Sequence, residues 1–183
     1  MPSPPTPLPA NATALFDLAT AARRFIEPIW MGWHRAWGGD PPAVSSQWTC
    51  GRTSLFLVRI LSTRGFEARW VSGTPRTAPG EPEIGPYGYL CDGIWQSHAW
   101  AECGDYIVDI TADQFGAPPV LVVDRGDRRY CKGERDTALP EFVAARQRAV
   151  DDIWTGWLRL QPGSDETPPT ALVPPLAAAM EDR

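Results

Sequence analysis

The dipeptide Gly104-Asp105 separates two apolar runs, residues 94–103 and 106–110, and it constrains the fold more than any other feature of the chain. Short connections that contain glycine or aspartate favour β-hairpins, whose two strands run antiparallel. A two-residue turn at this position pairs Cys103 with Tyr106 and so fixes the register of the strands. An antiparallel sheet is therefore predicted in the middle of the chain.

This register places two polar side chains on one face of the hairpin. It sets Trp100 opposite Asp109 and His98 opposite Thr111, so His98 and Asp109 become diagonal neighbours with roughly 7–8 Å between their backbones. A carboxylate without a partner is costly in an apolar strand, which favours a bonded Asp109 over one that faces water. We therefore predict a hydrogen bond from His98 to Asp109, although a slip of one residue would place them on opposite faces.

Periodicity and turn signals predict the other elements. Helices are expected over residues 12–29, after Asn11 as the cap, over 50–64, closed by Gly65, and over 140–160. Further strands are expected at 66–72 and 120–123, with a long loop rich in proline and glycine at 73–93. The inner face of the last helix is predicted to hold Phe142, Val143, Val150, Ile153, Trp154 and Trp157. Helices combined with neighbouring antiparallel strands predict the α+β class.

Composition limits the organisation of the chain and its partners. A length of 183 residues suits one domain, and the 20 prolines gather toward the two ends. We expect a disordered Pro-rich arm over residues 1–10, a single domain over 11–160 and a Pro-rich tail over 161–183. A net charge of −5 without a block of Lys or Arg disfavours nucleic acid and anionic membranes as partners. No signal-like start or membrane-length apolar run is found, so a cytoplasmic protein is expected.

The four cysteines at positions 50, 91, 103 and 131 are expected to be thiols. Their spacing matches no disulfide framework, and without a C-x-x-C pair a zinc site from Cys91, His98, Cys103 and Cys131 is disfavoured. No metal or cofactor is expected. Cys50 differs from the others because it opens a predicted helix, where free N–H groups and the helix dipole stabilise a thiolate. The alternative is a buried core cysteine.

Other side chains near Cys50 are candidates for supporting roles. An acyl-transfer reaction needs donors for an oxyanion, and the backbone N–H of Cys50 with the side chains of Gln47 and Trp48 are candidates, although both side chains can instead serve packing. Asp113 and Gln114 follow the second hairpin strand and can hold the loop, hold a substrate or turn the chain. His34 is predicted to lie in a turn-prone aromatic stretch, which leaves His98 as the candidate base.

These residues resemble a known family. Cys50 at a helix start, His-Ala-Trp-x-Glu at 98–102 and Asp-x-Thr at 109–111 resemble the transglutaminase-like branch of the papain-like cysteine enzymes, in particular its small bacterial members. The resemblance covers about residues 48–116. It implies that Cys50 is the nucleophile, that His98 is the base and then the acid, and that Asp109 orients His98. It also implies an α+β papain-like core in which the Cys helix packs on a small antiparallel sheet.

Two departures from the family argue against protein cross-linking. The Gly-Gln-Cys-Trp signature of animal transglutaminases is absent, since residues 47–52 read Gln-Trp-Thr-Cys-Gly-Arg, and the interval from His98 to Asp109 is short. The leading hypothesis is a thiol-dependent amide or acyl hydrolase or acyl transferase, of the peptidase, amidase or deamidase type, acting on a peptide, protein or small amide. Alternatives are a catalytically inactive domain of this kind that binds a peptide or protein, and an adaptor that acts through its Pro-rich ends.

Overall fold

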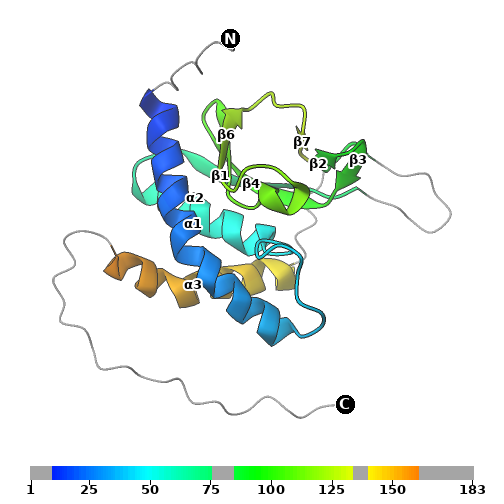
Figure 1. The fold of residues 1–183 in the computed structure, drawn as a ribbon. Helices are drawn as coiled ribbons and strands as arrows, with labels where there is room; N and C mark the ends of the chain where they lie inside the picture. Colours follow the sequence, from blue (N-terminus) through cyan, green and yellow to red (C-terminus); the bar gives the residue numbers. More distant parts are fainter. Residues whose placement is uncertain (1–9, 76–84, 134–139, 161–183) are drawn as a thin grey trace, which may run out of the picture.

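Three helices and two antiparallel sheets make up the described part of the chain, so the protein belongs to the α+β class. The computed structural model describes residues 10–75, 85–133 and 140–160 (Figure 1). The expected Pro-rich arm, except Ala10, and the expected tail lie outside these ranges. The helices are α1 (Ala10–Trp37), α2 (Cys50–Thr63) and α3 (Pro140–Arg159). Within the described residues, no helix has both the length and the apolarity needed to cross a bilayer.

The two sheets differ in size and in strand order. The larger one has the order β1 (Ala68–Gly73), β4 (His98–Cys103), β5 (Tyr106–Asp109) and β6 (Leu121–Asp124). The smaller one has the order β3 (Ile94–Gln96), β2 (Gly88–Cys91) and β7 (Tyr130–Cys131). A short 3₁₀ helix, η1 (Ala112–Phe115), follows β5. All strand pairs are antiparallel.

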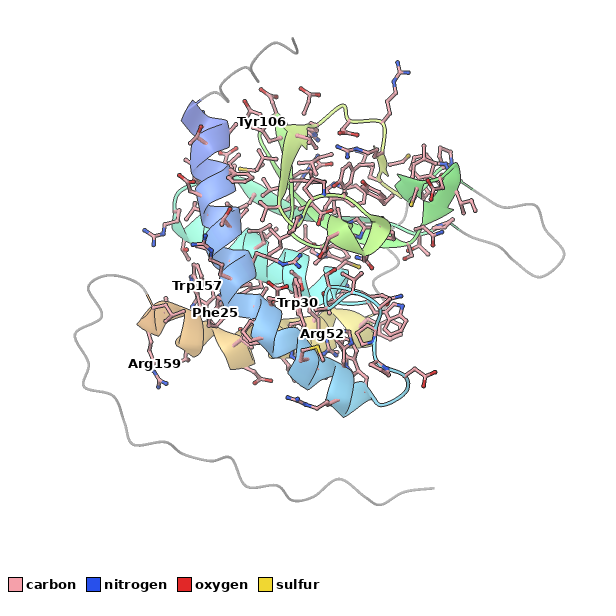
Figure 2. The ribbon with its side chains drawn as sticks, viewed as in Figure 1. Phe25, Trp30, Arg52, Tyr106, Trp157 and Arg159 are labelled. Atoms are coloured by element: carbon pink, nitrogen blue, oxygen red, sulfur yellow. The ribbon has the colours of Figure 1, made fainter. Side chains whose placement is uncertain are left out.

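Helix α2 is the central element of the main core. It packs on β4 and β1 on one side and on α1 and α3 on the other, as the cyan ribbon in Figure 1 shows. Its buried apolar side chains are Phe56, Leu57, Ile60 and Leu61. Phe25 of α1 and Trp157 of α3 meet beside them with ring centroids 5.6 Å apart (Figure 2). Burial of side chains of this size stabilises the fold by about 1.5–3 kcal/mol each.

Strand β4 separates two cores because successive side chains point to opposite faces of a sheet. Ala101 and Cys103 belong to the core formed with the helices. Trp100 belongs to a second core, with Tyr89 and Tyr130 of the smaller sheet. All six residues of β4 are buried. The second core is where the candidate catalytic residues meet, so the smaller sheet closes over that face.

The predicted hairpin register is confirmed, but the predicted strand 94–103 is wrong at its start. Cys103 pairs with Tyr106, and the ladder continues to Ala101 opposite Val108. The chain breaks at Ser97, so residues 94–96 form β3 and join the smaller sheet rather than the hairpin. The expected loop at 73–93 contains β2, and its residues 76–84 lie outside the described part. Both errors have one cause, the β2–β3 hairpin with its tight turn at Asp92-Gly93, which the sequence reasoning missed although the Asp-Gly pair is a local hairpin signal.

Helix α1 is longer than the predicted 12–29, and His34 is helical rather than part of a turn. Pro28 lies inside the helix, where proline removes one hydrogen bond and crowds the preceding turn. Tertiary contacts compensate, since Trp30 is fully buried and the Arg52 guanidinium lies over the rings of Trp33 and Trp37. Figure 2 shows Trp30 and Arg52 at this end of α1. The predicted end of this helix at residue 29 was therefore too early, because helix propensity does not include these tertiary contacts.

Helix α3 has the predicted extent, but part of its predicted inner face is wrong. Val150 and Trp157 are buried as expected, and Ile153 and Trp154 are partly buried against the same core. Phe142 and Val143 are exposed instead. Val143 lies seven residues before Val150 and therefore on the same helix face. Its exposure means that the first turns of α3 extend past the surface on which the rest of the helix packs.

Gly88→Ala is expected to destabilise the protein more than Gly93→Ala. Both glycines have positive φ, +100° and +80°, which costs a residue with a Cβ about 1–2 kcal/mol. A Cβ at Gly88 would also lie 2.0 Å from the carbonyl oxygen of Gln96, whereas a Cβ at Gly93 would meet nothing within 4 Å. Urea denaturation of the two variants measures the difference. Equal losses of unfolding free energy would contradict the close packing described at Gly88.

Candidate functional site

Two side chains of α2 fix the position of Cys50. Cys50 is the first residue of the helix, as predicted, and is partly exposed. Ser54, four residues later on the same face, donates its hydroxyl to the carbonyl of Ala99 at 2.8 Å. Thr53 accepts a hydrogen bond from the indole Nε1 of Trp30 at 2.9 Å. Because Ala99 directly follows His98, the Ser54 bond holds the start of α2 beside His98.

His98 and Asp109 form a buried pair. His98 is the first residue of β4 and Asp109 the last of β5, and the observed hairpin register places both on the same face. His98 Nε2 lies 2.6 Å from Asp109 Oδ2, and neither side chain is accessible to solvent. The hydrogen bond expected from the sequence is thus present. The nitrogen of His98 that bonds Asp109 is Nε2, which leaves Nδ1 as the nitrogen available to another group.

Asp109 is held by more groups than His98 alone. Its Oδ1 accepts hydrogen bonds from the backbone N–H of Thr111 at 2.8 Å and from the Thr111 hydroxyl at 3.0 Å. Its Oδ2 also accepts the phenolic O–H of Tyr130 at 3.0 Å. Burial by itself raises the pKa of Asp109, but His98 and these hydrogen bonds outweigh it and hold the pKa below its ordinary value. Asp109 is therefore a carboxylate fixed in position.

His98 is arranged to carry a positive charge. Burial alone lowers the pKa of His98, but the charge and hydrogen bond of Asp109, together with the neighbouring Cys50, raise it to about 10. Among the described residues, Nδ1 has no hydrogen bond of regular geometry. The Cys50 side chain is near enough to contribute to the raised pKa. The structure thus brings all three predicted catalytic residues together, with the imidazole between the carboxylate and the thiol.

Aromatic rings surround the imidazole and exclude water from it. The rings of Phe115 and Tyr89 meet it edge-on, with centroids 5.0 and 5.7 Å away. Trp100 lies at 6.1 Å and Tyr130 at 6.3 Å. A low local dielectric strengthens the attraction between His98 and its charged partners.

The loop before α2 is fastened to η1 by charged and polar groups. Arg23 of α1 lies 2.7 Å from the carboxylate of Asp113, and Ser46 donates its hydroxyl to the same carboxylate at 2.6 Å. Arg23 also donates to the carbonyl of Ile110 at 2.8 Å. Gln114 donates to the carbonyl of Thr111 and accepts the backbone N–H of Trp48 at 3.4 Å. Of the alternatives for Asp113 and Gln114, the structure shows them holding the loop.

The two side chains proposed as oxyanion donors lie on that loop. Gln47 Oε1 accepts the backbone N–H of Ala43 at 3.1 Å, which leaves its Nε2 as the donor atom. Trp48 is 62% exposed and has a φ of 63°, an unusual backbone conformation for a bulky residue. Its ring lies edge-on to His34, with centroids 6.2 Å apart. Both residues thus belong to the segment that directly precedes Cys50 in the chain.

Both residues also line a cleft of about 590 Å³. Its described walls come from three parts of the chain: residues 47–48 before α2, residues 91–92 and 96–97 of the β2–β3 hairpin, and residues 114–115 of η1. Phe115 belongs both to this wall and to the rings around His98. The cleft therefore reaches to within one aromatic ring of the imidazole.

Sequence reasoning missed Tyr130, Ser54 and Arg23. Tyr130 comes from β7, and pairing of β7 with β2 brings it to Asp109. No local pattern marks this tyrosine, since the contact depends on the smaller sheet. Ser54 had a usable signal, because it lies one helical turn after Cys50 and so on the same face. No signal in the sequence identified Arg23, because the predicted apolar stripe of the first helix gives no partner for it.

Of the other three cysteines, Cys91 lines the cleft and donates its thiol to the carbonyl of Phe115 at 3.5 Å. All four cysteines are free thiols, and Cys103 lies on the opposite face of β4 from His98. Within the described residues, no three His, Cys, Asp or Glu side chains gather as a metal ion would require.

Comparison with known proteins adds no relative. No protein-family model, no curated protein and no solved structure matches this chain.

Proposed function

We propose that the protein is a thiol-dependent amide or acyl hydrolase or acyl transferase that uses Cys50, His98 and Asp109. The observation that carries the proposal is the buried His98–Asp109 hydrogen bond of 2.6 Å, which holds Nε2 and leaves Nδ1 for the thiol. A carboxylate, an imidazole and a thiol in this order form a catalytic triad for acyl transfer. The expected substrate is a peptide, a protein or a small amide.

The raised pKa of His98, about 10, defines the first step of the proposed reaction. A protonated imidazole beside the sulfur pairs with the Cys50 thiolate, so no base is needed before attack. The thiolate forms a bond to the carbonyl carbon, and the new oxyanion is met by N–H groups at the start of α2. Gln47 Nε2 and the Trp48 indole are candidate further donors.

His98 then changes role in the proposed cycle. It gives its proton to the leaving nitrogen, the C–N bond breaks, and a thioester on Cys50 results. The neutral imidazole next takes a proton from water, or from an amine, that attacks the thioester. Release of the thiolate restores the ion pair. Asp109 orients the imidazole throughout and stabilises its charged form.

The architecture agrees with the resemblance found in the sequence, and we propose a transglutaminase-like, papain-like core. Three features support it: the Cys-bearing helix α2 packs on an antiparallel sheet, His98 begins β4, and Asp109 ends the next strand. The His-Ala-Trp-x-Glu segment is the whole of β4 except its last residue. Glu102 points away from the reaction and binds Arg69 and Arg125.

Cys50→Ala is expected to abolish formation of an acyl-enzyme. The assay is incubation with p-nitrophenyl acetate followed by intact-protein and peptide mass spectrometry. Cys131→Ser, which removes a partly exposed thiol in β7, is the matched control and should retain the Cys50 adduct. An acetyl group that forms equally well without Cys50, in a folded protein, would remove the basis of the proposal.

A catalytically inactive binding domain is the second candidate, and complete burial of the His98 side chain favours it. Iodoacetamide alkylation at neutral pH separates the two candidates. A thiolate paired with His98 reacts faster than free cysteine, whereas an inert thiol reacts more slowly. Slow alkylation together with tight peptide binding would favour the binding domain.

A further inference from the structure

The cleft described above lies beside the candidate catalytic residues and is separated from His98 by the ring of Phe115, so the groups that line it can select a substrate. Trp48 lies two residues before Cys50, and Phe115 lies against His98 with ring centroids 5.0 Å apart. A molecule in the cleft therefore contacts the surroundings of both the thiol and the imidazole.

The cleft carries one negative charge. Among its described lining residues, Asp92 is the only Asp, Glu, Lys or Arg. Asp92 is exposed, and within the described residues no Lys, Arg or His forms an ion pair with it. Its position is fixed by the tight β2–β3 turn, in which Asp92 and Gly93 both have positive φ, 50° and 80°. An exposed carboxylate at a fixed position attracts a cation.

Trp48 provides a second contact for a cation. Trp48 is 62% exposed although tryptophan is usually well buried. The backbone around it is strained by its φ of 63° and is held by the bond from its N–H to Gln114. An aromatic face attracts ammonium and guanidinium groups, which add to the attraction of a carboxylate nearby.

Side-chain amides also line the cleft. Gln47 presents its Nε2, since its oxygen is occupied by Ala43, and the Gln96 side chain is exposed on β3. Side-chain amides both donate and accept hydrogen bonds, as a peptide backbone requires. A cleft with amides, one carboxylate and an exposed indole suits a peptide with a positive charge better than an apolar or anionic molecule.

We propose that the substrate is a peptide in which a Lys or Arg side chain flanks the amide attacked by Cys50, with Asp92 and Trp48 binding the cation. The reaction at that amide rests on the proposed function, whereas the choice of a cationic peptide rests on the cleft. Asp92 is a specificity residue, and its removal changes substrate preference without changing the chemistry.

Binding to Cys50→Ala tests the inference without requiring catalysis. The probes are three capped peptides that differ at one position only, with Lys, norleucine or Glu, and their affinities are measured by isothermal titration calorimetry. The Lys peptide is expected to bind about tenfold more tightly than the norleucine peptide. Adding Asp92→Asn should remove most of this preference, and Asp92→Lys should reverse it in favour of the Glu peptide.

Asp105→Asn is the matched control. It makes the same change in net charge at the β4–β5 turn, at the end of β4 opposite His98, and should leave the preference unchanged. Equal binding of the three peptides, a preference that survives Asp92→Asn, or the same loss in Asp105→Asn would overturn the inference. A protein that prefers Lys peptides but is not acylated at Cys50 keeps the inference and loses the proposed chemistry. A protein that is acylated at Cys50 but does not prefer Lys peptides keeps the proposed chemistry and loses the inference.

Discussion

Asp109→Asn is expected to lower turnover by about 10³-fold while the protein stays folded. The asparagine has the shape of Asp109 but no charge, and its amide nitrogen donates where a carboxylate oxygen accepts. With that N–H facing His98, Nε2 must become the acceptor, and the single proton of the neutral ring moves to Nδ1. The ring then cannot take a proton from the attacking water or amine, and its charged form loses its partner.

Release of p-nitrophenol from p-nitrophenyl acetate measures this effect in the steady state. Asp152→Asn is the control, since Asp152 is an exposed carboxylate on α3. Circular dichroism establishes that both variants retain the fold. The thiol should still be present in Asp109→Asn, so complete but slower alkylation by iodoacetamide is also expected. Activity within threefold of the native protein would show that the His98–Asp109 bond is structural only.

In Cys50→Ala, where no thiolate is coupled to the imidazole, the free energy of unfolding is expected to fall by about 2 kcal/mol between pH 6.5 and pH 8.5. Asp109, the larger cause of the raised pKa of His98, remains in this variant. The pKa of His98 is about 10 in the folded protein and 6.5 without its partners. Because the folded pKa is the higher one, the stabilisation is complete below pH 6.5 and is lost as the pH rises toward 10. A window that ends at pH 8.5 stays below the ordinary cysteine pKa of 9.0, and burial raises the pKa values of Cys103 and Cys131 above it, so these thiols contribute little.

Asp109 also makes the free energy of unfolding depend on pH, but at acidic pH and in the opposite direction. Its folded pKa lies below the ordinary value of 3.8, so its stabilisation is present above that pH and is lost on further acidification. Maximum stability is therefore expected between about pH 4 and pH 6.5. Urea denaturation at several pH values measures the loss of stability on both the acidic and the alkaline side of this range.

Adding Asp109→Asn to Cys50→Ala provides the control for the loss of stability at alkaline pH. Without the carboxylate, the main cause of the raised pKa of His98 is gone, so the variant should lose stability much less steeply from pH 6.5 to 8.5. A Cys50→Ala protein whose unfolding free energy is constant over this range would show that His98 is not charged at neutral pH. That result would also remove the ion pair from the proposed reaction.

The sequence predicted the hairpin well because its signal is local. A two-residue turn between apolar strands fixes which residues pair along the whole hairpin, so it predicted the pairing of Cys103 with Tyr106. The same register predicted that His98 and Asp109 share one face. The start of α2 at Cys50 was local in the same way. Prediction failed where packing outweighs propensity: α1 continues through Pro28 because Trp30 is buried, and the first turns of α3 are exposed although Val143 shares the face of Val150.

What the sequence determined by itself was therefore the pair of positions that can bond, His98 and Asp109, and the helix start that places a thiol at Cys50. Only the tertiary structure decided that the imidazole is fully enclosed, that Tyr130 from β7 supports the carboxylate, and that Asp92 and Trp48 share one cleft. The physical reason is separation along the chain. Turn and helix signals act over a few residues, whereas these contacts join segments that meet only when the smaller sheet packs against β4.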